Sequence, residues 1–198
     1  MNDFLQCDEY IDYKSDNIIE CAKELFKNCQ TDIEKAKVAY EFVRDKIPHS
    51  FDINAKLITS KASDVLKYKT GICHAKANLF AALLRSQGIM TGFCFSHLTL
   101  ADDESMGYCI HGYNAVFLDN HWIKLDARGN KEGVNAEFSI AEPILAYPPR
   151  EQYDEYTIKG IFAKPHEEMM KMLDEAKDLQ YICDNIPDYV NQKPEIAE

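Results

Sequence analysis

Cys73 is the residue around which chemistry could be organised, because it stands two residues after Gly71 at the head of an apolar helical pattern. A cysteine inside a helix is most often a small hydrophobic residue of the core. A cysteine at a helix N-terminus lies instead at the positive end of the helix dipole, which favours the thiolate. The sequence therefore singles out Cys73 as a candidate nucleophile that needs a base beside it.

Imidazole suits a thiol as its base, because its pKa lets it take the thiol proton and later protonate a leaving group. The chain has six histidines. His74 is adjacent to the thiol, but consecutive helical residues point about 100° apart, so it is set aside. His49 lies in a predicted loop and His166 at a predicted loop-to-helix junction, so neither is positioned by a rigid element. The remaining candidates lie on predicted strands.

Two β-prone runs, 108–118 and 121–127, are separated only by Asp119 and Asn120. A two-residue link of this kind predicts a β-hairpin, in which the numbers of opposing residues sum to 239. A three-residue loop or a bulge would shift this register by one residue.

This register places His111 and Asp126 on one face as diagonal neighbours, roughly 7–8 Å apart between Cα atoms, while His121 points to the other face. A carboxylate beside an imidazole is the pair that orients the base of a catalytic triad. The sequence thus predicts a triad of Cys73, His111 and Asp126. The alternative from the residues alone is structural: a core thiol, a hydrogen-bonded strand histidine and a turn-forming aspartate.

The surrounding pattern predicts mostly helices before residue 88 and strands after it. Helices are expected over 16–29, 31–46, 60–67 and 73–88, and a strand over 89–97. Beyond Pro143 the chain reads as an extended arm, followed near Pro165 by a terminal helix whose packing face is Met169, Met172, Leu173, Ala176 and Leu179. We expect a catalytic domain over 1–142 and, over 143–198, an arm and helix packed on the same domain.

Composition limits the possible partners of the chain. Its 198 residues suit one domain, and its net charge of −11 with a pI near 5.0 disfavours nucleic acid. No apolar run approaches the roughly 20 residues that cross a bilayer, and the first residues do not form a signal peptide. Seven irregularly spaced cysteines are a poor disulfide framework. A cytoplasmic protein without nucleic-acid or membrane partners is expected.

A zinc site is a weaker alternative for the same region. Cys94 and His97 could combine with Cys109 and His111. On a strand, however, residues i and i+3 face opposite sides, and structural zinc sites need four converging ligands. We expect no metal.

Three blocks of the sequence resemble the transglutaminase-like superfamily of papain-type folds. They are "ASDVLKYKTGICHAKANLFAALLRSQGI", "HGYNAVFLDNHWIKLDA" and "KAKVAYEFVRDKIPHSFD". The chain is most similar to small bacterial-type members, although they often have Trp where His74 stands. The resemblance implies an α+β papain-like core, an antiparallel sheet packed on the helix whose N-terminus carries the nucleophile. It assigns the nucleophile, base and orienting acid to Cys73, His111 and Asp126.

The implied activity is thiol-dependent acyl transfer on a protein or peptide amide, needing no cofactor. Hydrolysis, deamidation and transamidation all begin with the same acyl-enzyme. A catalytically inactive, transglutaminase-like protein-binding module is the alternative, and acetyl transfer from a thioester is a further enzyme alternative. The backbone N–H of Cys73 would stabilise the oxyanion, with a second donor from a loop, for which His49 is a candidate.

Overall fold

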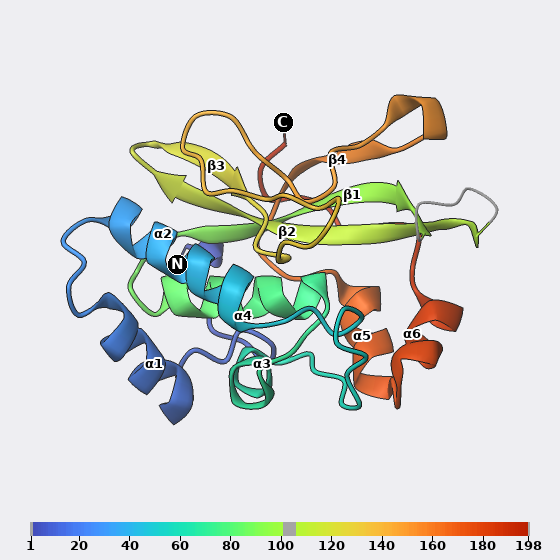
Figure 1. Cartoon of the computed structure of the whole chain (residues 1–198). Coiled ribbons are helices and arrows are strands. Elements are labelled where there is room, and N and C mark those ends of the chain that lie inside the picture. The colour runs from blue at the N-terminus through green and yellow to red at the C-terminus, as the bar shows by residue number, and fades with distance from the viewer. Residues whose placement is uncertain (1, 101–105, 198) are drawn as a thin grey trace.

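A four-stranded antiparallel sheet forms one layer of the structure and helices form the other (Figure 1). The computed structural model describes residues 2–100 and 106–197. The strands are β1 (Thr91–Thr99), β2 (Tyr108–Leu118), β3 (His121–Leu125) and β4 (Tyr156–Phe162), in the order β3-β2-β1-β4. The helices are α1 (Asp16–Phe26), α2 (Asp32–Lys46), α3 (Ala62–Tyr68), α4 (Cys73–Arg85), α5 (Glu167–Glu175) and α6 (Leu179–Asn185), with 3-10 turns η1 (Asp3–Leu5) and η4 (Glu151–Tyr153). The predicted α+β class is confirmed.

The start of α2 is fixed by the capping box read in the sequence. Thr31 Oγ1 accepts from the Glu34 backbone N–H at 3.2 Å, and Glu34 Oε2 accepts from the Thr31 N–H at 3.1 Å. Caps of this kind stabilise a helix by about 1 kcal/mol, because they satisfy N–H groups that have no partner inside it. The helix therefore begins where the sequence predicts.

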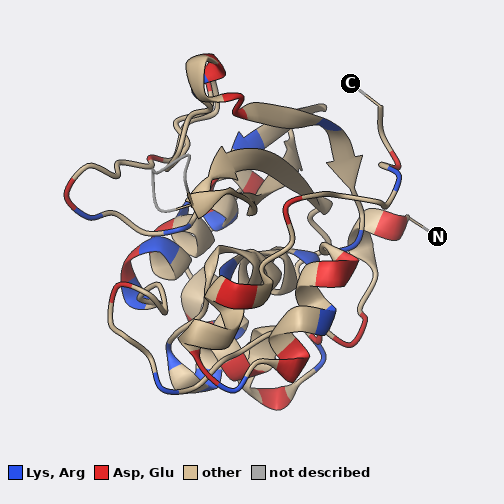
Figure 2. Cartoon of the chain, turned by 90° about the vertical axis from the view of Figure 1, so that its right-hand side faces the viewer, with Lys and Arg blue, Asp and Glu red and all other residues tan. Residues whose placement is uncertain are grey.

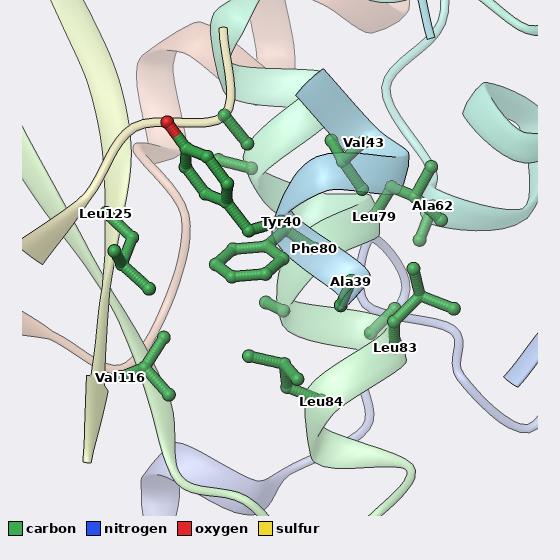
Figure 3. Close-up of a cluster of buried hydrophobic side chains, with 14 of the residues drawn as sticks. Ala39, Tyr40, Val43, Ala62, Leu79, Phe80, Leu83, Leu84, Val116 and Leu125 are labelled. Atoms are coloured by element: carbon green, nitrogen blue, oxygen red, sulfur yellow. The ribbon is translucent and has the colours of Figure 1, made fainter. Parts of the chain in front are cut away.

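Helix α4 lies between the sheet and the other helices, and every residue from 74 to 85 is buried. Figure 3 shows the ring of Phe80 beside Tyr40 of α2, with Val116 and Leu125 reaching toward it from the strands. The Tyr40 and Phe80 rings are 6.2 Å apart and nearly perpendicular, a favourable geometry for two aromatic rings. Burial of one such side chain contributes about 1.5–3 kcal/mol. This packing fixes α4, and with it the position of Cys73.

The β2–β3 hairpin has the predicted two-residue loop. Leu118 pairs with His121 and Asn114 with Leu125, so opposing numbers sum to 239. Asp119 and Asn120 both have positive φ, 47° and 65°, as the turn that matches strand twist requires. The predicted register is therefore confirmed, and His111 and His121 lie on opposite faces of the sheet.

The C-terminal part contributes a strand that the sequence did not predict. Residues 156–162 form β4, which pairs antiparallel with β1 at the edge of the sheet. Phe162 packs against Phe95 of β1 with ring centroids 4.9 Å apart, so this segment completes the core. The division into 1–142 and 143–198 stays a prediction.

The predicted terminal helix is two helices. Helix α5 ends at Glu175 because Ala176 is extended, with φ −69° and ψ 125°. Asp178 then caps α6 by accepting from the Tyr181 N–H at 2.8 Å. The sequence predicted Ala176 and Leu179 on the packing face of one helix. In the structure Ala176 lies at the break between the helices and Leu179 is the first residue of α6.

Charge is distributed over the structure. Figure 2 shows Asp and Glu on several helices and loops, with Lys and Arg interspersed. Among the described residues, no helix is both long and apolar enough to cross a membrane.

Candidate functional site

Cys73 is the first residue of α4, and its side chain is partly exposed whereas the helix behind it is buried. A bridge between His49 and Gly71 holds the entry to the helix, where Ser50 N–H donates to the Gly71 carbonyl at 3.1 Å. The thiol is therefore at an accessible helix N-terminus, where the sequence placed it.

The early end of β3 leaves one edge of β2 available next to this helix. Strand β3 pairs only with residues 114–118. Every second residue of β2 directs its N–H and C=O groups to the edge that β3 covers. Ile110 belongs to this set but lies beyond the end of β3, so its backbone groups bind other partners. There Ile110 N–H donates to the Pro187 carbonyl at 3.1 Å, and His74 Nε2 donates to the Ile110 carbonyl at 2.8 Å. His74 thus anchors α4 to β2.

Gly112 brings Cys73 to this same edge. A Cβ atom at Gly112 would lie 2.5 Å from His74 Nδ1, so only glycine allows this approach. The Gly112 N–H lies near the Cys73 sulfur and lowers the pKa of the thiol. The body of α4 packs on the face of Asn114, whose side chain donates to the Ala77 carbonyl at 3.2 Å. Because the thiol lies at the edge, it interacts with His111, which stands on the other face.

His111 and Asp126 form a buried hydrogen-bonded pair. His111 Nε2 donates to Asp126 Oδ2 at 2.8 Å, and the two side chains are 5% and 1% exposed. The Ala146 N–H donates to the same carboxylate oxygen at 3.0 Å, and the Arg128 N–H donates to Oδ1 at 3.1 Å. Because Nε2 is occupied, Nδ1 is the ring nitrogen left to face the thiol. The structure brings together the three residues that the sequence selected.

The electrostatics of this trio favour a thiolate beside an imidazolium. Burial raises the pKa of the Cys73 thiol, but His111 and the Gly112 N–H outweigh burial and hold that pKa below its ordinary value. Burial alone would lower the pKa of His111, whereas Asp126 and Cys73 raise it to about 10. Burial opposes the charge of Asp126, but the bond from His111 and two backbone N–H groups keep its pKa below the usual value.

The segment after β3 covers the His–Asp pair. The Tyr147 ring stands edge-on to the His111 ring, with centroids 5.3 Å apart and planes at 88°. Tyr147 is partly buried and so limits access of water to the pair. Neither Ala146 nor Tyr147 could be identified from the sequence, because Ala146 acts through its backbone and Tyr147 lies 36 residues from His111. No local pattern marks either contact.

A partly buried ion pair joins two loops next to the site. Both terminal nitrogens of Arg128 donate to the Asp52 carboxylate, Nη2 to Oδ1 at 2.8 Å, and Lys131 Nζ reaches the same carboxylate at 3.1 Å. Lys76 lies beneath them on α4, 1% exposed, and donates to the Ile47 carbonyl. Burial and the nearby Arg128 lower the pKa of Lys76 to about 7. These cations and Asp52 were not identified from the sequence.

His49 contacts the nucleophile through the backbone. The Cys73 N–H donates to His49 Nε2 at 3.1 Å, so His49 is an acceptor here rather than the donor that the sequence analysis considered. The side chain is 8% exposed, and its ring stacks on Phe51 with centroids 6.0 Å apart. Burial and the charge of Arg128 hold the pKa of His49 well below its ordinary value, so the ring is neutral. Its Nδ1 has no hydrogen-bond partner among the described residues.

The other histidines have structural contacts. His121 is exposed at the hairpin, and its Nδ1 lies 3.1 Å from the Asp119 carbonyl. His166 caps α5 by accepting from the Met169 N–H at 3.0 Å, and it bonds the Tyr189 carbonyl. Within residues 2–100 and 106–197, no group of three or more His, Cys, Asp or Glu side chains could hold a metal ion. No disulfide joins the cysteines in this part of the chain.

Comparison with known families matches this geometry to one of them. The model of the transglutaminase-like superfamily matches residues 19–127, more than half of the chain and all of the Cys73, His111 and Asp126 region. The chain belongs to the transglutaminase-like superfamily. The antiparallel sheet packed on the helix that carries Cys73 is consistent with an α+β papain-like core.

Two solved structures align with part of the chain. A candidate cysteine protease of Cytophaga hutchinsonii superposes with a TM-score of 0.50 at 19% sequence identity, over 63% of this chain and 40% of that chain. A candidate protease of Parabacteroides distasonis gives 0.44 at 14% identity, over 68% of this chain and 27% of that chain. The matched region thus spans less than half the length of either structure. No curated protein matches the chain.

Proposed function

We propose that this transglutaminase-like protein transfers acyl groups from a protein or peptide amide through a triad of Cys73, His111 and Asp126. The observation that carries the proposal is the buried 2.8 Å pair between His111 Nε2 and Asp126 Oδ2, with Cys73 at the imidazole and its pKa lowered. An oriented imidazolium beside a thiolate is the activated form of a cysteine nucleophile. A site with these features suits catalysis better than a purely binding role.

The proposed reaction has two halves. The Cys73 thiolate attacks the amide carbon, and the carbonyl electron pair moves to oxygen. When the carbonyl re-forms, the C–N bond breaks, and the leaving amine or ammonia takes a proton from His111. A water molecule or an amine then loses a proton to His111, attacks the thioester and releases the thiolate. Asp126 keeps its charge and stabilises the imidazolium throughout.

The acceptor in the second half sets the name of the activity. Water gives an amidase or peptidase, or deamidation of glutamine, whereas a lysine amine gives transamidation. The net charge of −11 supports a peptide or protein substrate over a nucleic acid. A reducing cytoplasm, which the cysteine pattern favours, would keep the thiol in its active form.

Selective alkylation tests the nucleophile. Purified protein is treated with a small excess of iodoacetamide at pH 7, and peptide mass spectrometry follows all seven cysteines over time. We expect Cys73 to react first and His111→Ala to slow it, since the imidazolium no longer stabilises the thiolate. Equal rates at Cys73 and at exposed Cys183 would contradict the proposal.

A peptide screen then identifies the reaction. Glutamine-containing peptides are incubated with wild-type protein and with Cys73→Ala, each with and without a primary amine. Ammonia release without amine indicates deamidation, a mass gain equal to the amine minus ammonia indicates transamidation, and backbone cleavage indicates a peptidase. Products that are equal with Cys73→Ala would refute a role for this thiol.

A further inference from the structure

His49 is the buried polar side chain that the triad leaves unexplained. It touches the reacting residue at one atom, because its Nε2 accepts from the Cys73 N–H at 3.1 Å. Its second nitrogen, Nδ1, is buried and has no partner among the described residues. Buried polar atoms are nearly always hydrogen-bonded, so an orphan next to a nucleophile needs a reason.

Neither neutral form of this imidazole satisfies its surroundings. With the proton on Nδ1, Nε2 accepts from Cys73 but a buried N–H donor has no acceptor. With the proton on Nε2, two N–H groups, from His49 and from Cys73, point toward the same space. An anionic oxygen placed between the two nitrogens would satisfy both donors at once.

The location favours such an anion. Cys73 opens a helix of 13 residues, and the first N–H groups of a helix carry its positive dipole end. The carbonyl oxygen of an acyl group attached to the Cys73 sulfur can reach the Cys73 N–H, because the sulfur and that N–H belong to one residue. The backbone of His49 is held there by the bridge to Gly71, and its ring lies beside Phe51.

We propose that His49 is a further catalytic residue, the second donor of the oxyanion hole. In the free protein the Nε2 atom of His49 accepts the hydrogen bond from the Cys73 N–H. During attack the ring moves aside and stays neutral: Nδ1 releases its proton to water, and Nε2 gains one from water. The oxyanion then accepts one hydrogen bond from Cys73 N–H and one from His49 Nε2–H. No covalent bond to His49 forms or breaks except these N–H bonds.

This inference rests on the proposed thiol chemistry, but two reagents test the Cys73 thiolate and the oxyanion hole separately. Iodoacetamide alkylates a thiolate by displacement and forms no oxyanion, whereas p-nitrophenyl acetate acylates it through a tetrahedral intermediate with one. Alkylation therefore reports the thiolate of Cys73, and the ratio of acylation to alkylation reports the oxyanion hole. The groups that lower the pKa of the Cys73 thiol are His111 and the Gly112 N–H, so alkylation reports mainly on them.

The experiment compares wild type with His49→Phe, His49→Gln and the exposed control His121→Phe, with rates at Cys73 read by mass spectrometry. We expect His49→Phe, which keeps a ring against Phe51, to slow acylation about 10²–10³-fold while alkylation changes less than about threefold. His49→Gln places an amide N–H near the position of Nε2 and should recover at least about tenfold of that loss. His121→Phe should match wild type in both rates.

Three results would overturn the role of His49. Acylation that is unchanged or faster in His49→Phe would mean that the imidazole merely blocks the Cys73 N–H. An equal loss of the acylation and alkylation rates in His49→Phe would mean that His49 has a structural role. If acylation is no faster in His49→Gln than in His49→Phe, no hydrogen-bond donor at this position is involved. A wild-type Cys73 that resists alkylation would instead refute the thiolate, and the oxyanion hole with it.

Discussion

Replacing Asp126 with asparagine changes one atom of the site and tests the orienting acid. Asp126 Oδ2 accepts from His111 and from the Ala146 N–H, and Oδ1 accepts from the Arg128 N–H. All three partners donate, but asparagine has a single acceptor oxygen. Whichever way the amide is turned, its NH₂ group therefore faces at least one N–H donor.

The magnitude follows from that mismatch. If the amide oxygen stays with Arg128, the NH₂ group forces His111 Nε2 to accept, so the proton moves to Nδ1 and the base has the wrong tautomer. The same change costs about 10⁴-fold in turnover in a serine-protease triad. The Ala146 N–H also loses its acceptor, and a buried unsatisfied donor costs about 1–3 kcal/mol. In a chain of this size that lowers Tm by about 2–12 °C.

The assay uses Asp119→Asn as the matched control, because Asp119 lies exposed in the hairpin with φ 47°, a conformation that asparagine tolerates. Turnover of any amide found in the peptide screen is measured for both variants. Iodoacetamide labelling at pH 6.5 is measured as well, and should slow about tenfold in Asp126→Asn for each unit by which the Cys73 pKa rises. If the two variants behave alike while circular dichroism shows both folded, Asp126 is a turn residue and the site reduces to a Cys–His pair.

Three further predictions concern the same site and its support. Gly112→Ala should destabilise the fold by about 1–3 kcal/mol, because its Cβ would overlap His74; thermal melts should show that His74→Ala added to it restores part of the loss, and an additive double variant would contradict the overlap. The rate of Cys73 alkylation should rise at a pH below that of an ordinary thiol, whereas turnover should fall only near pH 10 as His111 loses its proton; an alkylation midpoint at the ordinary thiol pKa would argue against the ion pair. Removal of residues 143–198 should abolish cooperative folding, since it takes away β4 and the Ala146 N–H; a folded, monomeric 1–142 fragment with reactive Cys73 would show that the arm is dispensable.

The pairing of His111 with Asp126, and the place of Cys73 at a helix start, could be predicted from sequence because both depend on local constraints. A two-residue turn fixes the register of a hairpin, and register fixes which side chains share a face. His111 and Asp126 are 15 residues apart and belong to one hairpin, so simple counting brought them together. The position of Cys73 followed from a glycine-led helix start, which is also a local signal.

The supporting contacts were not predictable, because they join distant segments. Arg128 binds Asp52 across 76 positions, and His49 meets Cys73 from a loop 24 positions earlier. Lys76 reads as a surface residue of an amphipathic helix, yet it is buried, since both faces of α4 are covered. Strand β4 follows two prolines and pairs with β1, far earlier in the chain. Sequence periodicity carries no information about such pairings.

The Cys73 thiol lies at the edge of β2, where it can meet side chains from both faces of the sheet. His111 stands on the face opposite the body of α4, so a helix simply laid on the sheet would leave Cys73 and His111 separated by the sheet. Two features remove that barrier: β3 ends at Leu125, which frees the edge of β2, and Gly112 lets the first turn of α4 approach it. A longer β3 would pair with the groups of Ile110 that now bind His74 and Pro187. The length of β3 is therefore as important to the proposed chemistry as the identities of the three reacting side chains.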